Sequence, residues 1–481
     1  MKAILPSLVA GLSAYSLVNA TATTRYVDLN STNSVVPYTS WATAATNIQR
    51  AVNLSQNGDL ILVNDGVYQE GTLNNPGTYP AANRVYVNRA VTVRSVNGPD
   101  ATFIVGSTNA SSRVRCVYLI DGASISGFTL TNGAVQYGAG GVESSSGSAV
   151  ISNCTIVGIA GTAVQSGSVY NSIIRENRST TFSFGVGAYQ SRLSGCLIVS
   201  NYSSYRGGGA GGSSLTNCVV VGNYAGSFGG GLDNCTAINC TIVGNTAHEA
   251  GGGADGGRLT NCIVYYNSTE FVPNSAYTNL SSTLNVRNCA TTPIPNGGVN
   301  CFTTPPAFVN LLAGNLRLQS NSPCINTGFN VAGLAATDKD GRPRLVATTV
   351  DIGAYEYQGS NMESYIAWLA EAGLPTQISS DTADPDGDGA NSWQEWRANT
   401  IPTNAASALR MAGVVNSAMG LEISWESVAT RDYWLERATN LGFAAPFETV
   451  ATNITGVAGT KTYTDSTATN GGPYLYRVGV Q

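Results

Sequence analysis

The sequence is poor in charge and has a single histidine. Asp, Glu, Lys and Arg make up 11% of its 481 residues, and 24 basic against 29 acidic side chains give a formal net charge of −5. Because no basic stripe is available to neutralise phosphates, nucleic acid is not an expected partner. The glycine-rich stretches lack the Lys and the helix start of a phosphate-binding loop, so they are interpreted as structural.

Long apolar runs are missing beyond the first twenty residues. Lys2 precedes an apolar stretch over residues 3–18, which ends in the cleavage-site pattern Val18-x-Ala20. The stretch is shorter than the roughly 20 residues that a spanning helix needs, so we predict a signal peptide over residues 1–20. The mature chain is then expected to be secreted or placed at the cell surface, as a monomer without a membrane span.

The sequence is rich in glycine and in a repeat of about 22 residues. It holds 55 glycines, and four segments align with one another at residues 193–201, 215–223, 237–245 and 259–267. Each segment alternates apolar and more polar positions, as a short half-buried strand does. The period and the turn-rich composition predict an all-β fold, a right-handed parallel β-helix in which each repeat is one coil.

The repeat places one cysteine in each aligned segment, at Cys196, Cys218, Cys240 and Cys262. Stacking would set them in a column at the ~4.8 Å spacing of neighbouring strands. We interpret them as buried free thiols that pack as small hydrophobes, with a disulfide or a metal site as the alternative. Four others fall outside this column, and their pairing stays open: Cys235, Cys289, Cys301 and Cys324.

Asparagine and glycine recur with the same period. An asparagine follows five residues after each of the four cysteines, at Asn201, Asn223, Asn245 and Asn267. Because asparagine tolerates the left-handed backbone conformation and can bond the neighbouring backbone, we predict an asparagine ladder between the coils. Glycine triplets come next at residues 207–209, 229–231 and 251–253. They predict positive φ or a close approach between coils.

Over about residues 24–320 the repeats resemble right-handed β-helix proteins of the pectate lyase fold. Residues 26–68 resemble the opening of bacterial members, in which a short amphipathic helix plugs the first coil. Residues 322–357 resemble a choice-of-anchor module, and we assign residues 21–358 to the β-helix with this cap and module. The resemblance gives the module no chemistry. Its Arg342 and Arg344 are expected to form a structural ion-pair cap, with a binding site as the alternative.

Two further segments follow the β-helix. Residues 384–395 match a calcium loop and resemble dockerin-like or thrombospondin type 3-like repeats, so residues 359–404 are predicted to be a helical linker that binds Ca²⁺. The expected ligands are Asp384, Asp386, Asp388, the Ala390 carbonyl, Ser392 through water, and Glu395. The alternative is a solvated acidic linker.

The pattern of residues 405–481 predicts short strands, and these residues resemble a fibronectin type III-like β-sandwich.

A polar column appears seven residues before each cysteine position: Gln165, Tyr189, Gly211, Asp233 and Asp255. Asp233 and Asp255 would lie on adjacent coils, where two carboxylates can share a proton or bind a cation. Arg192 and Arg258 belong to a neighbouring column and could hold a uronate or a sulfate. His248 lies in a turn and is either a solvated residue or a general base.

Two functional classes remain open. A polysaccharide lyase or glycoside hydrolase acting on acidic glycans would use Asp233, Asp255, His248 and Arg258 for catalysis and Tyr189, Arg192 and Gln165 for substrate. The coils lack the Arg-x-Pro-x-x-Arg string of the pectate lyase branch and the Gly-His-Gly of the polygalacturonase branch. We therefore favour a non-catalytic scaffold that binds extracellular polysaccharide or cell-surface glycan. The polar column would otherwise be an ordinary hydrophilic surface.

Overall fold

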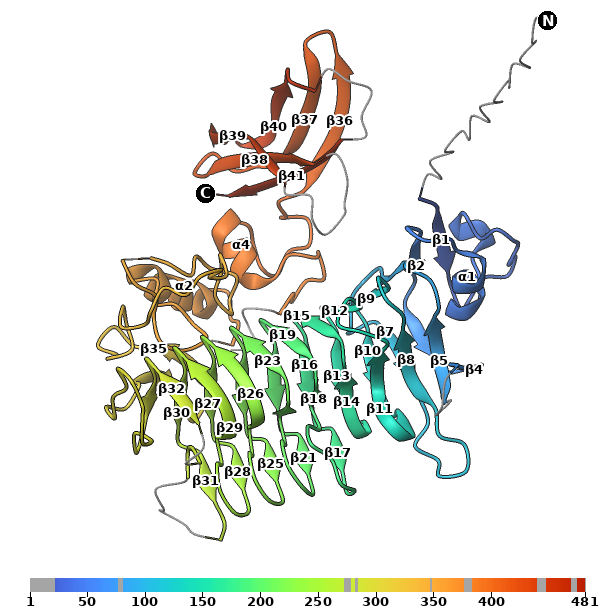
Figure 1. The fold of residues 1–481 in the computed structure, drawn as a ribbon. Helices are drawn as coiled ribbons and strands as arrows, with labels where there is room; N and C mark the ends of the chain where they lie inside the picture. Colours follow the sequence, from blue (N-terminus) through green and yellow to red (C-terminus); the bar gives the residue numbers. More distant parts are fainter. Residues whose placement is uncertain are drawn as a thin grey trace, which may run out of the picture.

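The main body of the molecule is a right-handed parallel β-helix of about 8 turns, which runs from β1 (Thr24–Val27) to β33 (Ala290–Thr291) (Figure 1). The computed structural model describes residues 22–76, 81–271, 278–281, 284–346, 348–375, 383–438, 447–468 and 474–480. The predicted signal peptide, residues 1–20, lies outside the described residues. In the described part of the chain, no helix is both long and apolar enough to cross a membrane.

The coils contribute to two large sheets. The ten-stranded sheet contains, in order, β3 (Gly66–Tyr68), β7 (Thr102–Val105), β10 (Thr129–Thr131), β13 (Thr155–Val157), β16 (Ile173–Arg175), β20 (Leu197–Val199), β24 (Val219–Val221), β27 (Thr241–Val243), β30 (Ile263–Tyr265) and β33. The 23-stranded sheet forms the rest of the coils and contains β1, β2 (Leu60–Val63), β4 (Leu73–Asn74), β5 (Ala82–Val87), β6 (Thr92–Ser95), β8 (Arg115–Leu119), β9 (Ser124–Ser126), β11 (Ala134–Ser144), β12 (Val150–Ser152), β14 (Ala160–Gln165), β15 (Ser168–Tyr170), β17 (Arg178–Ser179), β18 (Ala188–Tyr189), β19 (Arg192–Ser194), β21 (Tyr202–Ser203), β22 (Ala210–Gly211), β23 (Ser214–Thr216), β25 (Tyr224–Ala225), β26 (Leu232–Ile238), β28 (Thr246–Ala247), β29 (Ala254–Thr260), β31 (Ser268–Thr269) and β32 (Asn285–Arg287).

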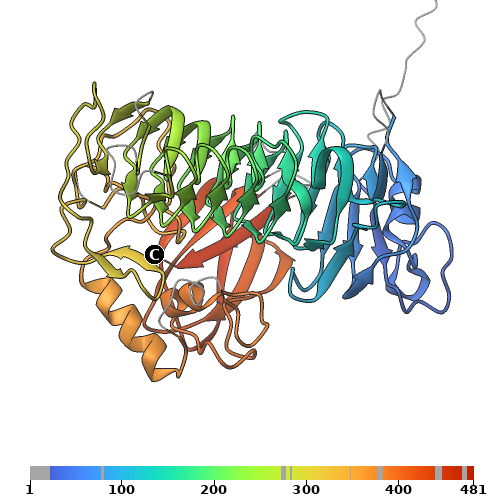
Figure 2. The same ribbon diagram turned by 90° about the horizontal axis from the view of Figure 1, so that it is seen from below.

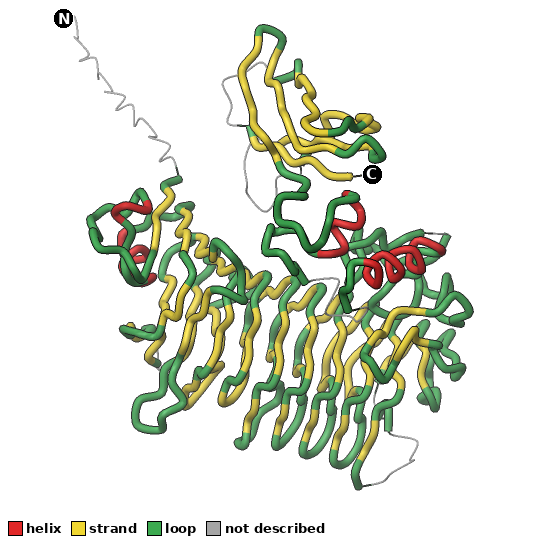
Figure 3. Tube along the Cα trace, turned by 180° about the vertical axis from the view of Figure 1, so that it is seen from behind, coloured by secondary structure: helices red, strands yellow, loops and turns green. Residues whose placement is uncertain are grey.

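The strand register confirms the repeat read from the sequence. Leu193 pairs with Leu215, Leu215 with Ala237, and Ala237 with Leu259. All of these side chains are buried, because the strand alternation turns the same position inward in every coil. They join one core that runs along the β-helix. At the N-terminal end of the β-helix lie the 3₁₀ turn η1 (Trp41–Thr43) and α1 (Ile48–Leu54) (Figure 3). Three side chains of α1 are buried in this core.

The cysteine column is longer than the repeat predicts. The Cys218 amide donates to Cys240 Sγ (3.4 Å) and the Cys262 amide donates to Cys289 Sγ (3.3 Å). Cys289 therefore stands in the column, and the flanking strand pairs put Cys301 beside it. The expectation that these two lie outside the column is wrong, because the coil between Cys262 and Cys289 spans 27 residues. All ten cysteines are free thiols, which leaves no disulfide among them.

The asparagine ladder is present, and it depends on the second of the two expected properties, hydrogen bonding to the neighbouring backbone. The Asn223 side-chain amide donates to Asn245 Oδ1 (2.9 Å) and to the Ile198 carbonyl (3.0 Å), and the pattern repeats in the adjoining coils. The ladder side chains are buried and satisfy backbone groups that would otherwise have no partner. The left-handed backbone conformation instead occurs one residue earlier, at Gly222 (φ 64°), and before the cysteine, at Asn217 (φ 51°).

The glycine triplets meet both of their expected requirements. The first glycine of each triplet has positive φ, with 61° at Gly207, 68° at Gly229 and 65° at Gly251. A Cβ on the last glycine of the first triplet, Gly209, would lie 2.5 Å from the Gly231 carbonyl oxygen. A larger residue at either kind of position would strain or separate the coils.

Residues 305–358, named here the fold-back module, pack on the outer face of the ten-stranded sheet. They begin with a hairpin of β34 (Phe308–Asn310) and β35 (Asn315–Leu318). Apolar side chains of the module share a cluster with outward side chains of the sheet. The Gly353 amide donates to the Asn261 carbonyl and the Ala354 amide to Thr241 Oγ1, both at 2.9 Å. Arg342 and Arg344 are fully buried among acidic groups, which supports a structural role.

In the described C-terminal residues, two helices precede a small β-sandwich. α2 (Ser360–Glu371) packs against α4 (Ser392–Ala398), and α4 lies between α2 and the sandwich (Figure 1). Figure 2 shows α2 beside the last coils of the β-helix. One sheet contains β36 (Met411–Ser417), β37 (Gly420–Ser427) and β40 (Gly459–Asp465), and the other contains β39 (Glu448–Thr455), β38 (Asp432–Ala438) and β41 (Leu475–Val480). The sandwich core includes the fully buried Trp425.

Candidate functional site

A single outward-facing column of residues, here the polar column, runs along the 23-stranded sheet. The register aligns Gln165 with Tyr189, Tyr189 with Gly211, Gly211 with Asp233, and Asp233 with Asp255. The same register extends the column toward the N-terminus through Glu143, Tyr118 and Tyr86. These three were not evident from the sequence, because the earlier coils depart from the regular repeat.

An arginine bridges the two carboxylates of the polar column. Arg206 Nε donates to Asp233 Oδ1 (3.1 Å), and Arg206 Nη2 donates to Asp255 Oδ2. The guanidinium also lies over the Phe228 ring, 4.8 Å from its centroid. Arg206 lies on an adjacent coil, directly before the first glycine triplet, and nothing in its local sequence marks it as a partner of these acids.

The environment of Asp233 favours the protonated carboxyl. Its side chain is nearly buried, and burial raises the pKa of Asp233 to about 6, with Arg206 opposing the shift and Asp255 adding to it. An acid that titrates near neutrality is a feature of catalytic sites and of structural ion-pair clusters alike. Each carboxylate nevertheless has an arginine as its direct partner.

An open hollow of about 390 Å³, here the aromatic groove, lies beside the polar column. Gln165 and Tyr189 of the column line it, together with residues of β11, Arg178 and the segment that follows β17. Phe182 is 80% exposed and Tyr137 is 58% exposed. Phe184 contacts Tyr189, with ring centroids 6.3 Å apart. The groove therefore combines exposed aromatic faces with amide, hydroxyl and guanidinium groups.

Gly211 separates the aromatic groove from the carboxylate pair. A Cβ at this position would lie 1.4 Å from the Phe184 carbonyl oxygen, so the chain that carries Phe184 crosses the polar column here. Glycine is required because the backbone of another segment occupies the place of its side chain. The column is thus divided into an aromatic part, at Gln165 and Tyr189, and a charged part, at Asp233 and Asp255.

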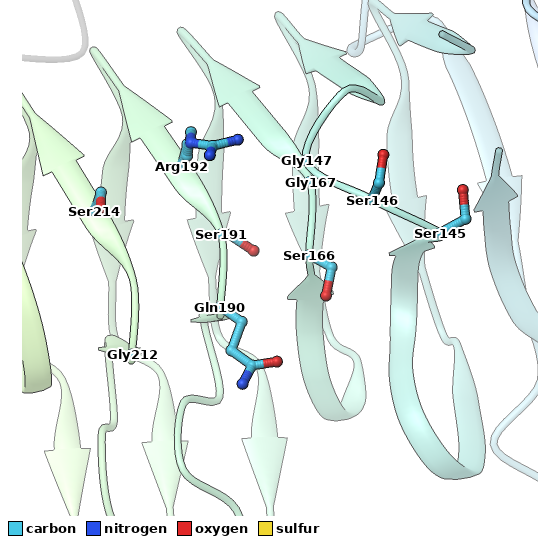
Figure 4. A pocket seen from close by; sticks show the side chains of 10 residues that line it. All are labelled: Ser145, Ser146, Gly147, Ser166, Gly167, Gln190, Ser191, Arg192, Gly212 and Ser214. Carbon is cyan, nitrogen blue, oxygen red and sulfur yellow. The ribbon is translucent and has the colours of Figure 1, made fainter. Parts of the chain in front are cut away.

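Arg192 and Arg258 belong to a second column, beyond a bend in the strands. The register places Arg192, Ser214, Thr236 and Arg258 in line. Arg192 lines a separate open hollow of about 410 Å³ that is otherwise surrounded by serines, glycines and Gln190 (Figure 4). A Cβ at Gly147 would lie 2.4 Å from Arg192 Nη1, so glycine gives the guanidinium its room. Neither arginine forms an ion pair with Asp233 or Asp255 among the described residues.

His248 lies at the surface, in the turn before the third glycine triplet. Its ring is exposed and 6.0 Å from the Phe271 ring, measured between centroids. Its backbone amide and carbonyl bond to neighbouring coils. The described residues give its ring no hydrogen-bond partner, which is the arrangement of a solvated turn residue.

The predicted metal loop brings three aspartates together. One carboxylate oxygen each from Asp384, Asp386 and Asp388 lies within 4.8 Å of the others. Glu395, in the first turn of α4, is fully buried, and its Oε2 has no hydrogen-bond partner. Burial and the three nearby aspartates raise the pKa of Glu395 to about 7. This donor set of hard oxygens, with a buried oxygen left unsatisfied, fits a divalent cation such as Ca²⁺.

Ser392 and Ala390, the other two expected ligands, make contacts of their own within the loop. Ser392 Oγ donates to the Ala383 carbonyl (3.2 Å), so this hydroxyl is engaged outside the aspartate cluster. The Ala390 amide donates to Asp388 Oδ1 (2.7 Å), which shapes the loop around that carboxylate. The donors left to hold a cation are therefore the three clustered aspartates and the unsatisfied oxygen of Glu395.

Comparison with solved structures defines the fold. Pectate lyase Pel9A aligns with a TM-score of 0.50 and 16% identity, over 70% of this chain and 97% of that one. Two further structures align more loosely. A rhamnogalacturonan lyase aligns with a TM-score of 0.29 and 12% identity, over 56% of this chain and 68% of that one. The tailspike gp49 of Acinetobacter baumannii bacteriophage Fri1, a capsular polysaccharide depolymerase, aligns with a TM-score of 0.30 and 9% identity, over 96% of this chain and 86% of that one. No family model and no curated protein matches the sequence. The chain is a parallel β-helix protein with a pectate lyase-like fold.

Proposed function

We propose that the protein binds an extracellular polysaccharide along the polar column and the aromatic groove, as a non-catalytic scaffold. The observation that carries this proposal is Arg206, which bridges Asp233 and Asp255 and so engages both carboxylates within the protein. Acid–base or nucleophilic chemistry on a sugar needs carboxyl groups that reach the glycosidic bond. These two instead hold a cation of the protein itself.

The aromatic groove supplies the binding chemistry. Exposed rings such as Phe182 offer apolar faces for the C–H faces of a pyranose, at a small cost in side-chain entropy. Gln165 and Arg178 line the same hollow and offer donors for hydroxyl or carboxylate groups. Because Glu143, Tyr118 and Tyr86 continue the polar column in register, a chain of sugars bound in the groove would extend toward the N-terminal coils.

A catalytic alternative is favoured by the raised pKa of Asp233 beside a second carboxylate. In that case the protein is a polysaccharide lyase or glycoside hydrolase, with Asp233, Asp255, His248 and Arg258 as the candidate groups. The structure distributes these groups over a charged cluster, an exposed turn and a second column. The Asp233→Asn variant separates the two functions, because only an enzyme would lose cleavage activity.

Binding is tested with a panel of neutral and acidic polysaccharides by calorimetry. We expect the double variant Phe182→Ala/Phe184→Ala to bind about tenfold to a hundredfold more weakly, because it loses the aromatic contacts at the centre of the groove. The matched control is Phe271→Ala, which removes another exposed phenylalanine outside the groove. Equal affinity of the groove variant and the wild type, or equal loss in the control, would contradict the proposed site.

We further propose that the loop of residues 384–395 binds Ca²⁺ through Asp384, Asp386, Asp388 and Glu395. Support comes from the clustered aspartates and from the unsatisfied buried oxygen of Glu395. Calorimetry with CaCl₂ is expected to show one site in the wild type and at least a tenfold loss of affinity in Asp384→Ala, because one charged ligand is removed. Undiminished affinity in the variant would remove the assignment.

The proposal includes export and the module assignments. We propose that residues 1–20 are a cleaved signal peptide and that the monomer acts outside the cell. Residues 21–358, 359–404 and 405–481 would then be the β-helix with its choice-of-anchor-like module, the calcium-loop linker and the fibronectin type III-like sandwich. N-terminal sequencing and light scattering of the exported protein test the first two points. An intact N-terminus after export, or a stable oligomer, would contradict them.

A further inference from the structure

Helix α4 is attached firmly to the β-helix side of the molecule. The Arg342 guanidinium of the fold-back module lies 3.6 Å from the centroid of the Trp393 ring of α4. Tyr365 of α2 meets the same indole edge-on, with centroids 4.9 Å apart and an interplanar angle of 88°. The module is in turn hydrogen-bonded to the coils through Thr241 and Asn261. One face of α4 is therefore tied to the β-helix.

The opposite end of α4 is attached to the sandwich. Arg431, at the start of β38, donates from Nε to the Arg397 carbonyl (2.7 Å) and from Nη2 to the Trp396 carbonyl (3.4 Å). These are carbonyls at the C-terminal end of the helix, where a cation is favourable. Arg397 Nη2 donates to the Val480 carbonyl of β41 (3.3 Å). Arg410, before β36, lies 3.8 Å from Asp388 of the metal loop.

The metal loop is the structural start of α4. Asn391 caps the helix, accepting from the Gln394 amide (2.9 Å), and Glu395 is already in the first turn. A helix of 7 residues has little stability of its own in water. Without a cation, three clustered carboxylates and the buried Glu395 repel one another at the end that must stay ordered.

We propose that calcium bound by this loop acts as the lock of the joint between the β-helix and the sandwich. The ion neutralises the clustered carboxylates, orders α4, and so holds in place both the Trp393 contact with Arg342 and the carbonyls that bind Arg431. Calcium would then fix the orientation of the sandwich relative to the β-helix. This inference rests on the calcium binding proposed above and adds a mechanical role to it.

Limited trypsin digestion of the full-length protein tests the lock, because Arg397 and Arg410 lie in the joint itself. At calcium concentrations about a hundred times Kd, release of the sandwich is expected to be about a hundredfold slower than in EGTA, since cleavage requires local opening. Small-angle scattering of the intact protein should show a wider distribution of dimensions in EGTA. If calorimetry shows no calcium binding, the proposed metal site fails. If calcium binds but digestion and scattering do not change, the site stands and the lock fails.

Two variants separate ligand loss from loss of the joint. Asp384→Ala removes a ligand outright, so its protection from trypsin by calcium should be at least about tenfold smaller than that of the wild type. Arg431→Ala leaves the ligands intact, so it should bind calcium normally yet release the sandwich faster than the wild type does. Asp432→Asn is the matched control, because it removes an exposed aspartate beside Arg431 and should behave as the wild type. Calcium protection of Arg431→Ala equal to that of the wild type would overturn the proposed joint.

Discussion

The middle coils of the β-helix and the joint around α4 are held together by opposite means. The coils repeat neutral contacts, such as the asparagine ladder and the cysteine column, in each successive turn. The joint depends on single charged contacts, among them Arg342 on Trp393 and Arg431 on the end of α4. The coils share their stability among many equivalent contacts, whereas the proposed joint would depend on one bound ion.

The largest effect is expected from breaking one rung of the asparagine ladder. Asn223→Ala leaves buried backbone groups and the neighbouring ladder amides without partners, which should lower the free energy of unfolding by about 3–5 kcal/mol. Urea unfolding followed by circular dichroism measures this change. The control is Thr246→Ala, whose exposed hydroxyl bond to Ser268 should contribute little. A ladder variant as stable as the control would show that the coils do not depend on these neutral contacts.

A smaller effect is expected where the coils do carry charge. Asp233 has a pKa raised to about 6 by burial, so the folded state binds its proton more tightly than the unfolded state does. The stabilisation is present below the ordinary pKa of aspartate and is lost as the pH rises through about 6. The melting temperature of Asp233→Asn should therefore gain on that of the wild type between pH 4 and pH 7, measured by thermal scans. A melting temperature of Asp233→Asn that falls relative to that of the wild type over this range would show that Arg206 dominates the titration.

The smallest effect concerns the end of the cysteine column. Cys301 is half-buried, and a hydrogen bond from Cys289 lowers the pKa of Cys301 to about 7, whereas burial raises the pKa of Cys235 to about 12. Alkylation by iodoacetamide in the folded protein should occur first at Cys301, with a half-maximal rate near pH 7. Mass spectrometry of tryptic peptides identifies the modified thiol. Even labelling of all ten thiols would contradict the buried column.

The fold could be predicted from the sequence because each coil repeats the same pattern of buried, glycine and asparagine positions. The inward positions of Leu193 and its counterparts, the glycine triplets and the ladder all follow from one period. Local sequence could not locate Arg206, since its partners lie on other coils. It also misplaced Cys289, because a longer coil breaks the spacing. Contacts made by loops and by segments distant in sequence depend on the path of the chain in space.

The candidate site likewise has parts that follow from the repeat and parts that depend on loops outside it. The polar column from Gln165 to Asp255 could be read from the period, and the aspartates of the metal loop from their spacing. The aromatic groove could not, because Phe182 and Phe184 lie in a segment that interrupts the repeat. In the sequence, Gly211 only interrupts the series of polar side chains in the column. The structure gives the reason, because the backbone at Phe184 crosses the column at this position.

The central claim is that the β-helix binds polysaccharide without cleaving it, and the most direct measurement follows both events in one sample. Polysaccharides that bind in calorimetry are incubated with the full-length protein, and chain length is followed by size-exclusion chromatography with detection of new reducing or unsaturated ends. We predict saturable binding that Phe182→Ala/Phe184→Ala weakens, with no change in chain length. Shortening of the polysaccharide by the wild type and not by Asp233→Asn would contradict the claim and establish an enzyme.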